Sequence, residues 1–417
     1  MKVTIFALIL TTLTTLGAAA EPVADFAIHD GDTVVFLGDS ITAARQYGKV
    51  IEEYTLLRFP HRRVNFINAG KGGETAKGSL ARLDSAVFAQ GATVLTVAYG
   101  VNDIGWGMKA DEAHKQEYLN AIDEIVDRCQ KRGVRVFICS AAITAEEPAK
   151  AEQGFLQRMC DEGLARARAK GAGTIDVQRT MREVQRRALA SNAKEPDPKK
   201  HTRLHVDDGV HLNDLGQLAM GYAILKGLGA PADVSRATVD AHDPAAATGD
   251  GCRISAVSPD PDGVSFTRID ERLPLNLQPL WMLYGYFIPI SDELNRYSLA
   301  IKNLPEGRYA ISAGGRPLGA WTAAELSRGI NIASASADPW VPGGPWDAQG
   351  HALKTLTDVR DELAVVRRGL DETLGAHPRV KRLETETIAI EKEVVALQRE
   401  LSRPVPVRFI VRKESKQ

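Results

Sequence analysis

Apolar runs alternate with amphipathic stretches through the first half of the chain. The five runs lie at residues 34–37, 64–68, 92–98, 134–139 and 174–177. Between the third and fourth runs, residues 112–132 place apolar side chains at a helical period. Strands that are joined by helical crossovers form a parallel sheet covered by helices on both faces. The pattern therefore predicts such a sheet from about residue 33 to residue 229.

The pattern changes after residue 229. Residues 230–251 are rich in Ala, Asp and Pro, which is typical of a linker. Short β-type runs then follow at residues 263–269, 297–304, 308–312 and 405–411. The turn Leu304-Pro305-Glu306-Gly307 predicts a hairpin between the second and third of these runs. We expect an accessory β-rich region over residues 252–417, with the last run returning to it.

Two helical seams lie inside this accessory region. Apolar residues recur in alternating steps of three and four from Leu356 to Leu370, and again from Val380 to Leu401. Pro378 lies in the short break between the two seams. This short break favours an antiparallel helical hairpin within residues 350–402 of one chain. Pairing of these helices between two chains, which would give a dimer, is the alternative.

The first twenty residues have the pattern of a secretory signal peptide. Lys2 precedes a short apolar stretch that leads to Ala18-Ala19-Ala20 before Glu21. This stretch is too short to span a bilayer, and no later stretch has the length and apolar character to do so. We expect residues 1–20 to be cleaved and the protein to be exported, to the periplasm or the cell exterior.

Composition excludes several other classes of protein. The chain has 417 residues, a formal net charge of −1 and 44% hydrophobic residues, which is ordinary for a globular protein. This near-neutral balance gives no basic surface for nucleic acid. Its four cysteines are too few for a disulfide scaffold, and no two have zinc-ligand spacing. We expect buried thiols; a Cys129–Cys139 or a Cys160–Cys252 bridge is the alternative.

Four polar blocks follow the predicted strands. They are Gly38-Asp39-Ser40 after the first strand, Asn68 to Thr75 after the second, Tyr99 to Asp103 after the third, and Asp207 to Asn213 after the fifth strand and its helix. Ligands of parallel sheets bind outside the carboxyl ends of the strands. All four blocks lie at that edge, so we expect them to form one site.

In this order, the four blocks resemble those of the SGNH (GDSL-like) hydrolase family. The resemblance covers roughly residues 33–229, and places the catalytic domain at residues 21–229 of the exported chain. It implies a three-layer α/β/α fold of the flavodoxin-like kind, with a five-stranded parallel sheet. It also implies a serine esterase that uses neither a metal ion nor an organic cofactor. No resemblance of this kind covers the second half.

The candidate nucleophile is Ser40. Serine is a weak nucleophile until a base takes its proton, and His211 is the candidate base. The imidazole must be held in one tautomer and its cationic form stabilised, and Asp208 can do this from three residues earlier. Asp207 is the alternative to Asp208, which the family spacing favours.

Attack on an ester gives a tetrahedral oxyanion, which needs hydrogen-bond donors already in place. The resemblance assigns these donors to the backbone N–H groups of Ser40 and Gly73 and to the side-chain amide of Asn102. Asp39 and Trp106 are candidate substrate-binding residues. Asp39 can instead serve the structure of the turn, and Trp106 can equally be a core residue.

We therefore expect an exported serine esterase that hydrolyses short-chain esters, in particular acetyl esters of carbohydrate, through an acyl-enzyme intermediate. Its substrate would be a small-molecule or a polysaccharide ester. The first alternative is an acylhydrolase of the lysophospholipase or lipase type, whose long acyl chain would need an apolar groove. The second is a non-catalytic carbohydrate-binding or assembly protein, against which the complete set of candidate residues argues.

Overall fold

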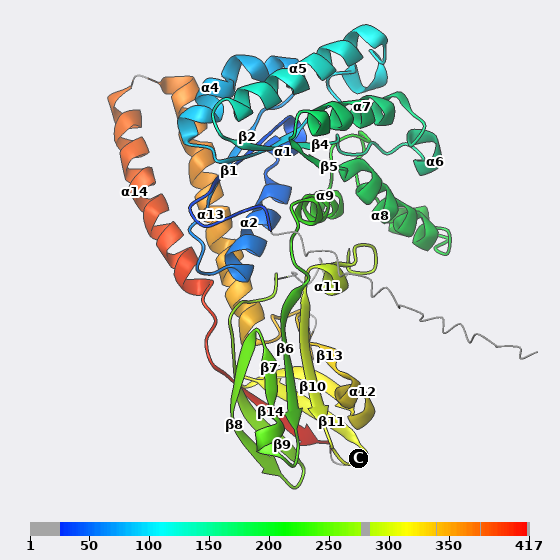
Figure 1. Ribbon diagram of the computed structural model, residues 1–417, viewed down its shortest axis with the longest axis vertical. Coiled ribbons are helices and arrows are strands. Elements are labelled where there is room, and N and C mark those ends of the chain that lie inside the picture. The colour runs from blue at the N-terminus through cyan, green and yellow to red at the C-terminus, as the bar shows by residue number, and fades with distance from the viewer. Residues whose placement is uncertain (1–25, 277–283, 339, 376, 415–417) are drawn as a thin grey trace, which may run out of the picture.

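The computed structural model describes residues 26–276, 284–338, 340–375 and 377–414. The predicted signal peptide, residues 1–20, lies outside the described residues. In Figure 1 the chain forms an upper α/β part and a lower β-rich part, and a long helical hairpin connects them along one side.

The α/β part is built on a five-stranded parallel sheet with the order β2-β1-β3-β4-β5. Its strands are β1 (Thr33–Gly38), β2 (Asn65–Gly70), β3 (Val94–Ala98), β4 (Arg135–Cys139) and β5 (Gly173–Ile175). The central strand β1 pairs Val35 with Ile67 of β2 and with Leu95 of β3. The sheet confirms the fold class that the sequence predicts.

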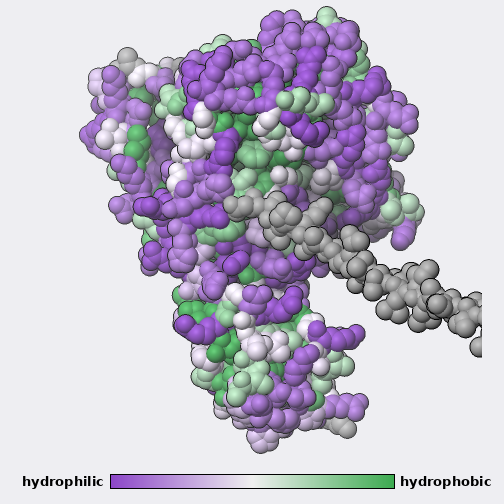
Figure 2. All heavy atoms as spheres, in the orientation of Figure 1, coloured by the Kyte–Doolittle hydropathy of each residue, from purple (hydrophilic) through white to green (hydrophobic). Residues whose placement is uncertain are grey.

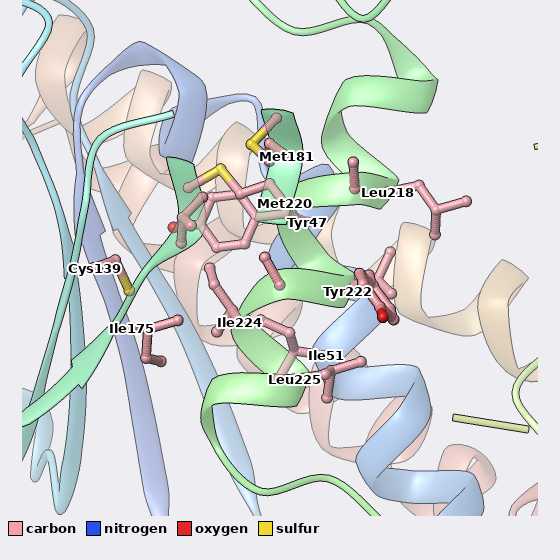
Figure 3. Close-up of a cluster of buried hydrophobic side chains, with 14 of the residues drawn as sticks. Tyr47, Ile51, Cys139, Ile175, Met181, Leu218, Met220, Tyr222, Ile224 and Leu225 are labelled. Carbon is pink, nitrogen blue, oxygen red and sulfur yellow. The ribbon is translucent and has the colours of Figure 1, made fainter. Parts of the chain in front are cut away.

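Helices cover both faces of this sheet because the strands are apolar on both sides. Along β1, Val34 and Phe36 face one core, and Val35 and Leu37 face the other. The first core is covered by α2 (Gln46–Arg58), α8 (Val177–Asn192) and α9 (Asp214–Gly227), and Figure 3 shows its packing around α9. The second is covered by α3 (Ala76–Ser79), α4 (Leu83–Ala86), α5 (Glu112–Gln130) and α7 (Phe155–Ala169). The short helices α1 (Ser40–Ala43) and α6 (Pro148–Ala151) complete this part.

The β-rich part consists of two sheets around a shared core. A four-stranded sheet has the order β13-β10-β6-β7, and a five-stranded antiparallel sheet has the order β12-β11-β14-β9-β8. The bounds are β6 (Asp233–Asp240), β7 (Thr248–Asp250), β8 (Cys252–Asp260), β9 (Gly263–Asp270), β10 (Arg296–Lys302), β11 (Arg308–Ala313), β12 (Arg316–Thr322), β13 (Ile330–Asn331) and β14 (Val407–Lys413), with the short helices α11 (Ile290–Glu293) and α12 (Ala323–Arg328). Phe409 of β14 stacks between Phe266 and Trp346 in the core. As predicted, the last run of the chain returns to this unit as a strand.

Two predictions for this region are wrong. Residues 230–251 are not a linker, because β6 buries Val234, Ala237 and Val239 and pairs in parallel with β10, about sixty residues later in the chain. The predicted hairpin between the runs at 297–304 and 308–312 does not form. Asn303 has a left-handed φ of 62° after β10, and β10 and β11 then continue in different sheets.

The helical hairpin forms as predicted. Helix α13 (Pro345–Leu374) leaves the β-rich part and runs alongside α2, and α14 (Pro378–Leu401) returns antiparallel to it (Figure 1). Lys49 of α2 forms an ion pair with Asp358 of α13 at 2.8 Å. The hairpin therefore packs on the same helix that covers one face of the parallel sheet.

The surface, the helices and the cysteines bear on the expectations from composition. The face of the molecule in Figure 2 is hydrophilic around the margin of the α/β part, with apolar patches on the β-rich part. Within the described ranges, no helix has both the length and the apolar character needed to cross a bilayer. All four cysteines are free thiols, and three of them are buried, as the sequence predicts.

Candidate active site

The turn after β1 presents Ser40 at the carboxyl edge of the sheet. Ser40 is the first residue of α1, and the Asp39 carboxylate caps this helix by accepting the Ile41 N–H at 2.9 Å. A Cβ atom on Gly38 would lie 2.1 Å from Thr42 Oγ1 and 2.8 Å from the Ala98 carbonyl oxygen. Only glycine fits there, so the turn can be tight enough to expose the serine at the start of a helix.

His211 lies opposite this serine although 171 positions separate the two in the chain. Its Nε2 atom is 2.8 Å from Ser40 Oγ. The loop that carries it is held by the Val206 N–H, which donates to the His211 carbonyl oxygen at 2.9 Å. Two residues after it, Asn213 caps α9 by accepting the Gly216 N–H at 3.1 Å. The start of this buried helix therefore fixes the position of the imidazole.

Asp208 is the carboxylate that contacts His211. Its Oδ2 atom is 2.6 Å from His211 Nδ1, and its Oδ1 atom accepts the backbone N–H groups of Val210 and His211 at 2.8 and 2.9 Å. These hydrogen bonds lower the pKa of Asp208 to about 2, and the one to the His211 ring has the largest effect. The side chain of Asp207 is exposed, and its carboxylate lies 3.8 Å from Arg203.

The charge on Asp208 determines the tautomer of His211. An ionised carboxylate can only accept, so the Nδ1 atom carries the proton. The Nε2 atom is then left to accept the proton of the Ser40 hydroxyl group. This arrangement has the donor and acceptor directions that a serine nucleophile and its base require.

Gly73 and Asn102 lie on adjoining loops beside the turn that carries Ser40. The Lys71 N–H donates to the Gly38 carbonyl oxygen at 2.9 Å, which joins the glycine-rich loop to that turn. Within the loop, the Glu74 N–H donates to Lys71 O at 3.2 Å, and Gly73 has a φ of 71° that favours glycine. The Asn102 Nδ2 group donates to the Glu74 carbonyl oxygen at 3.1 Å. The three loops that carry the predicted oxyanion donors are thus hydrogen-bonded together.

A buried polar cluster that sequence reasoning missed supports this glycine-rich loop. The Glu74 carboxylate accepts hydrogen bonds from Tyr99 Oη at 2.6 Å and from Arg82 Nε at 2.7 Å. Arg82 also donates to the Ala69 carbonyl oxygen at 2.7 Å. Burial and the neighbouring Glu74 raise the pKa of Tyr99, so its hydroxyl group remains a donor. A charged residue directly after the Gly72-Gly73 pair was the only signal available in the sequence.

The remaining candidate residues, Asp39 and Trp106, and the neighbouring Asp103 have different surroundings. Asp39 is buried beneath the turn, and burial raises its pKa to about 6; its observed hydrogen bond serves the helix cap. Asp103 is also buried, accepts the Ala76 N–H at 2.9 Å, and has a pKa raised to about 7 by burial. Trp106 is 47% exposed, and its ring lies 5.5 Å from that of His211 in an edge-to-face arrangement. Only Trp106 of these three lies at the open rim of the site.

Solved structures of known proteins are similar to this chain over different lengths. BT4096, a gut microbial diltiazem-metabolizing enzyme, is similar with a TM-score of 0.79 and 23% identity, covering 94% of this chain and 99% of that one. LAE5, an alpha/beta hydrolase enzyme from the metagenome of Lake Arreo, Spain, matches with 23% identity and a TM-score of 0.40, covering 49% and 98%. Axe2, an acetylxylan esterase from Geobacillus stearothermophilus, matches with 18% identity and a TM-score of 0.39, covering 49% and 96%.

The likeness to BT4096 includes the β-rich part and the helical hairpin, so the two-part architecture is shared. No curated protein matches the sequence. Residues 36–219 match the model of the GDSL-like Lipase/Acylhydrolase family, and this segment contains the sheet from the middle of β1 onward, together with Ser40 and His211. This part of the chain is a GDSL-like lipase/acylhydrolase domain.

Proposed function

We propose that the chain is an exported serine esterase that hydrolyses short-chain esters, in particular acetyl esters of carbohydrate. The observation that carries the proposal is the hydrogen-bonded series from Ser40 Oγ through His211 to Asp208, with distances of 2.8 and 2.6 Å. Export rests on the pattern of residues 1–20 alone.

The proposed reaction begins when His211 Nε2 takes the proton from Ser40 Oγ. The oxygen attacks the ester carbonyl carbon, and the carbonyl electrons move to its oxygen, which the N–H groups of Ser40, Gly73 and Asn102 stabilise. When this intermediate collapses, the C–O bond to the alcohol breaks and the alcohol takes the proton from His211. Water then attacks the acyl group on Ser40, with His211 again as base. The bond between the acyl carbon and Ser40 Oγ breaks, Oγ takes the proton back from His211, and the carboxylic acid leaves.

The carbohydrate part of the proposal is supported by the rim of the site. The exposed indole of Trp106 lies beside His211, where a substrate's leaving group would emerge. Tryptophan offers a flat apolar face with a polar edge, which suits a partly polar ring. Because the similar enzyme BT4096 is described as diltiazem-metabolizing, diltiazem also belongs among the substrates to test.

The proposal is tested with nitrophenyl esters from acetate to palmitate, using the wild type, Ser40→Ala and, as a control, Ser191→Ala on the exposed end of α8. We expect a strong preference for acetate, its loss in Ser40→Ala, and full activity in the control. Acetylated xylan oligosaccharides and diltiazem are then compared. A preference for long chains would support the lipase-like alternative, and activity that survives in Ser40→Ala would refute the mechanism.

A further inference from the structure

We propose that Trp106 is a positioning residue whose indole N–H fixes the Asn102 side-chain amide in the orientation that an oxyanion hole needs. This inference rests on the proposed function, because it assigns a role relative to the proposed oxyanion donors. The hydrogen bond made by the indole N–H is separate from any contact between the face of the indole ring and a substrate.

The two hydrogen bonds of the Asn102 side chain determine which way the amide points. Trp106 Nε1 donates to Asn102 Oδ1 at 2.9 Å, and Asn102 Nδ2 donates to the Glu74 carbonyl oxygen at 3.1 Å. An indole N–H can only donate and a carbonyl oxygen can only accept. If the amide were flipped, its NH₂ group would face the indole N–H and its oxygen would face the Glu74 carbonyl oxygen. Both hydrogen bonds would then be lost.

This orientation leaves one amide N–H available for a ligand. The NH₂ group has two donors, of which the Glu74 carbonyl oxygen takes one. The same carbonyl belongs to the loop of Gly73, whose backbone N–H is the neighbouring proposed donor. Trp106 thus holds the amide oxygen on one side, and the glycine-rich loop holds the nitrogen on the other.

The backbone at Trp106 is unusual for so large a residue. Trp106 has φ 59° and ψ 29°, between Gly105 at φ 52° and Gly107 at φ 95°. A left-handed conformation has a free-energy cost for a residue that carries a Cβ atom. The Trp106 N–H donates to the Val101 carbonyl oxygen at 2.9 Å, which folds the chain back over Asn102. Burial of the ring does little to offset this cost, because the residue is 47% exposed.

The indole also contacts the base. Its ring lies edge-to-face with His211, with centroids 5.5 Å apart and an interplanar angle of 73°. One side chain therefore contacts both the proposed base and a proposed oxyanion donor. Its hydrogen bond to Asn102 is the contact that a change of side chain can remove selectively.

The test is a double-mutant cycle of Trp106→Phe and Asn102→Ala, with kcat and KM measured on nitrophenyl acetate. Phenylalanine keeps an aromatic ring and removes the N–H group. We expect Trp106→Phe to lower kcat about 10-fold with little change in KM, because an oxyanion contact acts in the transition state. Asn102→Ala should lower kcat about 100- to 1,000-fold. In the Asn102→Ala background, Trp106→Phe should have almost no further effect.

Two further variants make the result unambiguous. Met108→Ala changes a residue of the same loop that is 88% exposed, and should leave kcat unchanged. Trp106→Gly relieves the left-handed strain, so it should fold at least as stably as the wild type, and should still lose at least 10-fold in kcat.

An effect of Trp106→Phe that persists undiminished in the Asn102→Ala background would overturn the inference, as would a change confined to KM. The first result would mean that the indole acts independently of the amide, and the second that it only binds substrate. Failure of the proposed function itself would appear separately, as activity that survives in Ser40→Ala.

Discussion

At the scale of single residues, Asp208 and Asp207 form a natural comparison. They are adjacent carboxylates, but only Asp208 contacts His211, and Asp207 is exposed next to Arg203. We expect Asp208→Asn to lower kcat about 10,000-fold, because an amide at this position can donate to Nδ1 and stabilise the wrong tautomer. Asp207→Asn should retain wild-type kcat. Steady-state kinetics on nitrophenyl acetate compares the two, and equal effects would contradict the assignment.

Asp103 should make stability depend on pH. Burial raises its pKa from 3.8 to about 7, so the folded protein holds its proton where the unfolded chain has released it. The free energy of unfolding should therefore fall as pH rises from about 4 to 7, by up to about 4 kcal/mol from this group. In Asp103→Asn this fall should be smaller, so that the variant gains stability relative to the wild type at pH 8.

Urea unfolding at pH 5 and pH 8 measures this difference. Ser85→Ala on α4 is the control, because it changes an exposed residue that has no titratable group, and it should leave the pH dependence unchanged. An Asp103→Asn variant with the same slope as the wild type would show that other groups carry the pH dependence.

The residues at the reactive centre were the most predictable part of the site. Ser40, Asn102 and His211 each occur in a short block directly after a strand or before a helix, so local sequence determines their place. The Glu74 cluster was not predictable in this way. Its members lie 8 and 25 positions apart on separate elements, and only the folded sheet brings them together.

At the scale of elements, the interface between α2 and α13 is charged and buried. Glu52 of α2 forms an ion pair with Arg360 of α13 and accepts the Gln398 side-chain amide of α14 at 3.1 Å. Burial is the main influence on Glu52 and raises its pKa, which Arg360 opposes. Gln398 also donates to Thr357 Oγ1 at 2.8 Å. One carboxylate thus connects three helices from both parts of the chain.

We expect Glu52→Ala to lower the free energy of unfolding by about 3 kcal/mol. Removing one partner of a buried ion pair leaves the other charge buried without compensation. The matched control is Glu386→Ala, which removes the exposed pair with Arg382 on α14 at 2.8 Å and should cost no more than about 0.5 kcal/mol. Chemical unfolding of both variants gives the comparison, and similar small losses would mean that the α2–α13 contact contributes little.

Elements defined by their own pattern were predicted well, and elements that depend on a distant partner were not. The seams from Leu356 and from Val380 predicted α13 and α14 because helical periodicity is local. Strand β6 was mistaken for a linker because the segment around it, residues 230–251, is rich in Ala, Asp and Pro, and because its partner β10 comes much later in the chain. The turn after β10 has hairpin residues, but the strands on either side join different sheets.

At the scale of the whole molecule, the two parts share their cores. Leu56 and Leu57 of α2 pack in the core of the β-rich part, and Ile288 and Leu294 pack in the core of the α/β part. Arg58, also buried, donates to the carbonyl oxygens of Pro231, Asp233 and Leu294 at 3.0, 2.9 and 2.7 Å. Composition predicts a domain boundary at residue 229. In the structure, residues before and after this boundary pack together in shared cores.

We expect a fragment of residues 21–229 to fold poorly, although it contains every proposed catalytic residue. It would expose Leu56 and Leu57 and would leave the buried Arg58 guanidinium without its three acceptors. Soluble yield, the melting temperature and esterase activity are measured for this fragment alone and when co-expressed with residues 230–417. Co-expression should restore all three. A fragment with wild-type melting temperature and activity would show that the β-rich part is dispensable.

The most direct test of the central claim is covalent labelling of the nucleophile with a fluorophosphonate. The account predicts that one phosphonyl group adds to Ser40, identified by intact mass and peptide mapping. It also predicts that Ser40→Ala is not labelled and that His211→Ala is labelled far more slowly, because the base is missing. A label on another residue, or an active enzyme that takes up no label, would contradict the assignment of Ser40 as the nucleophile.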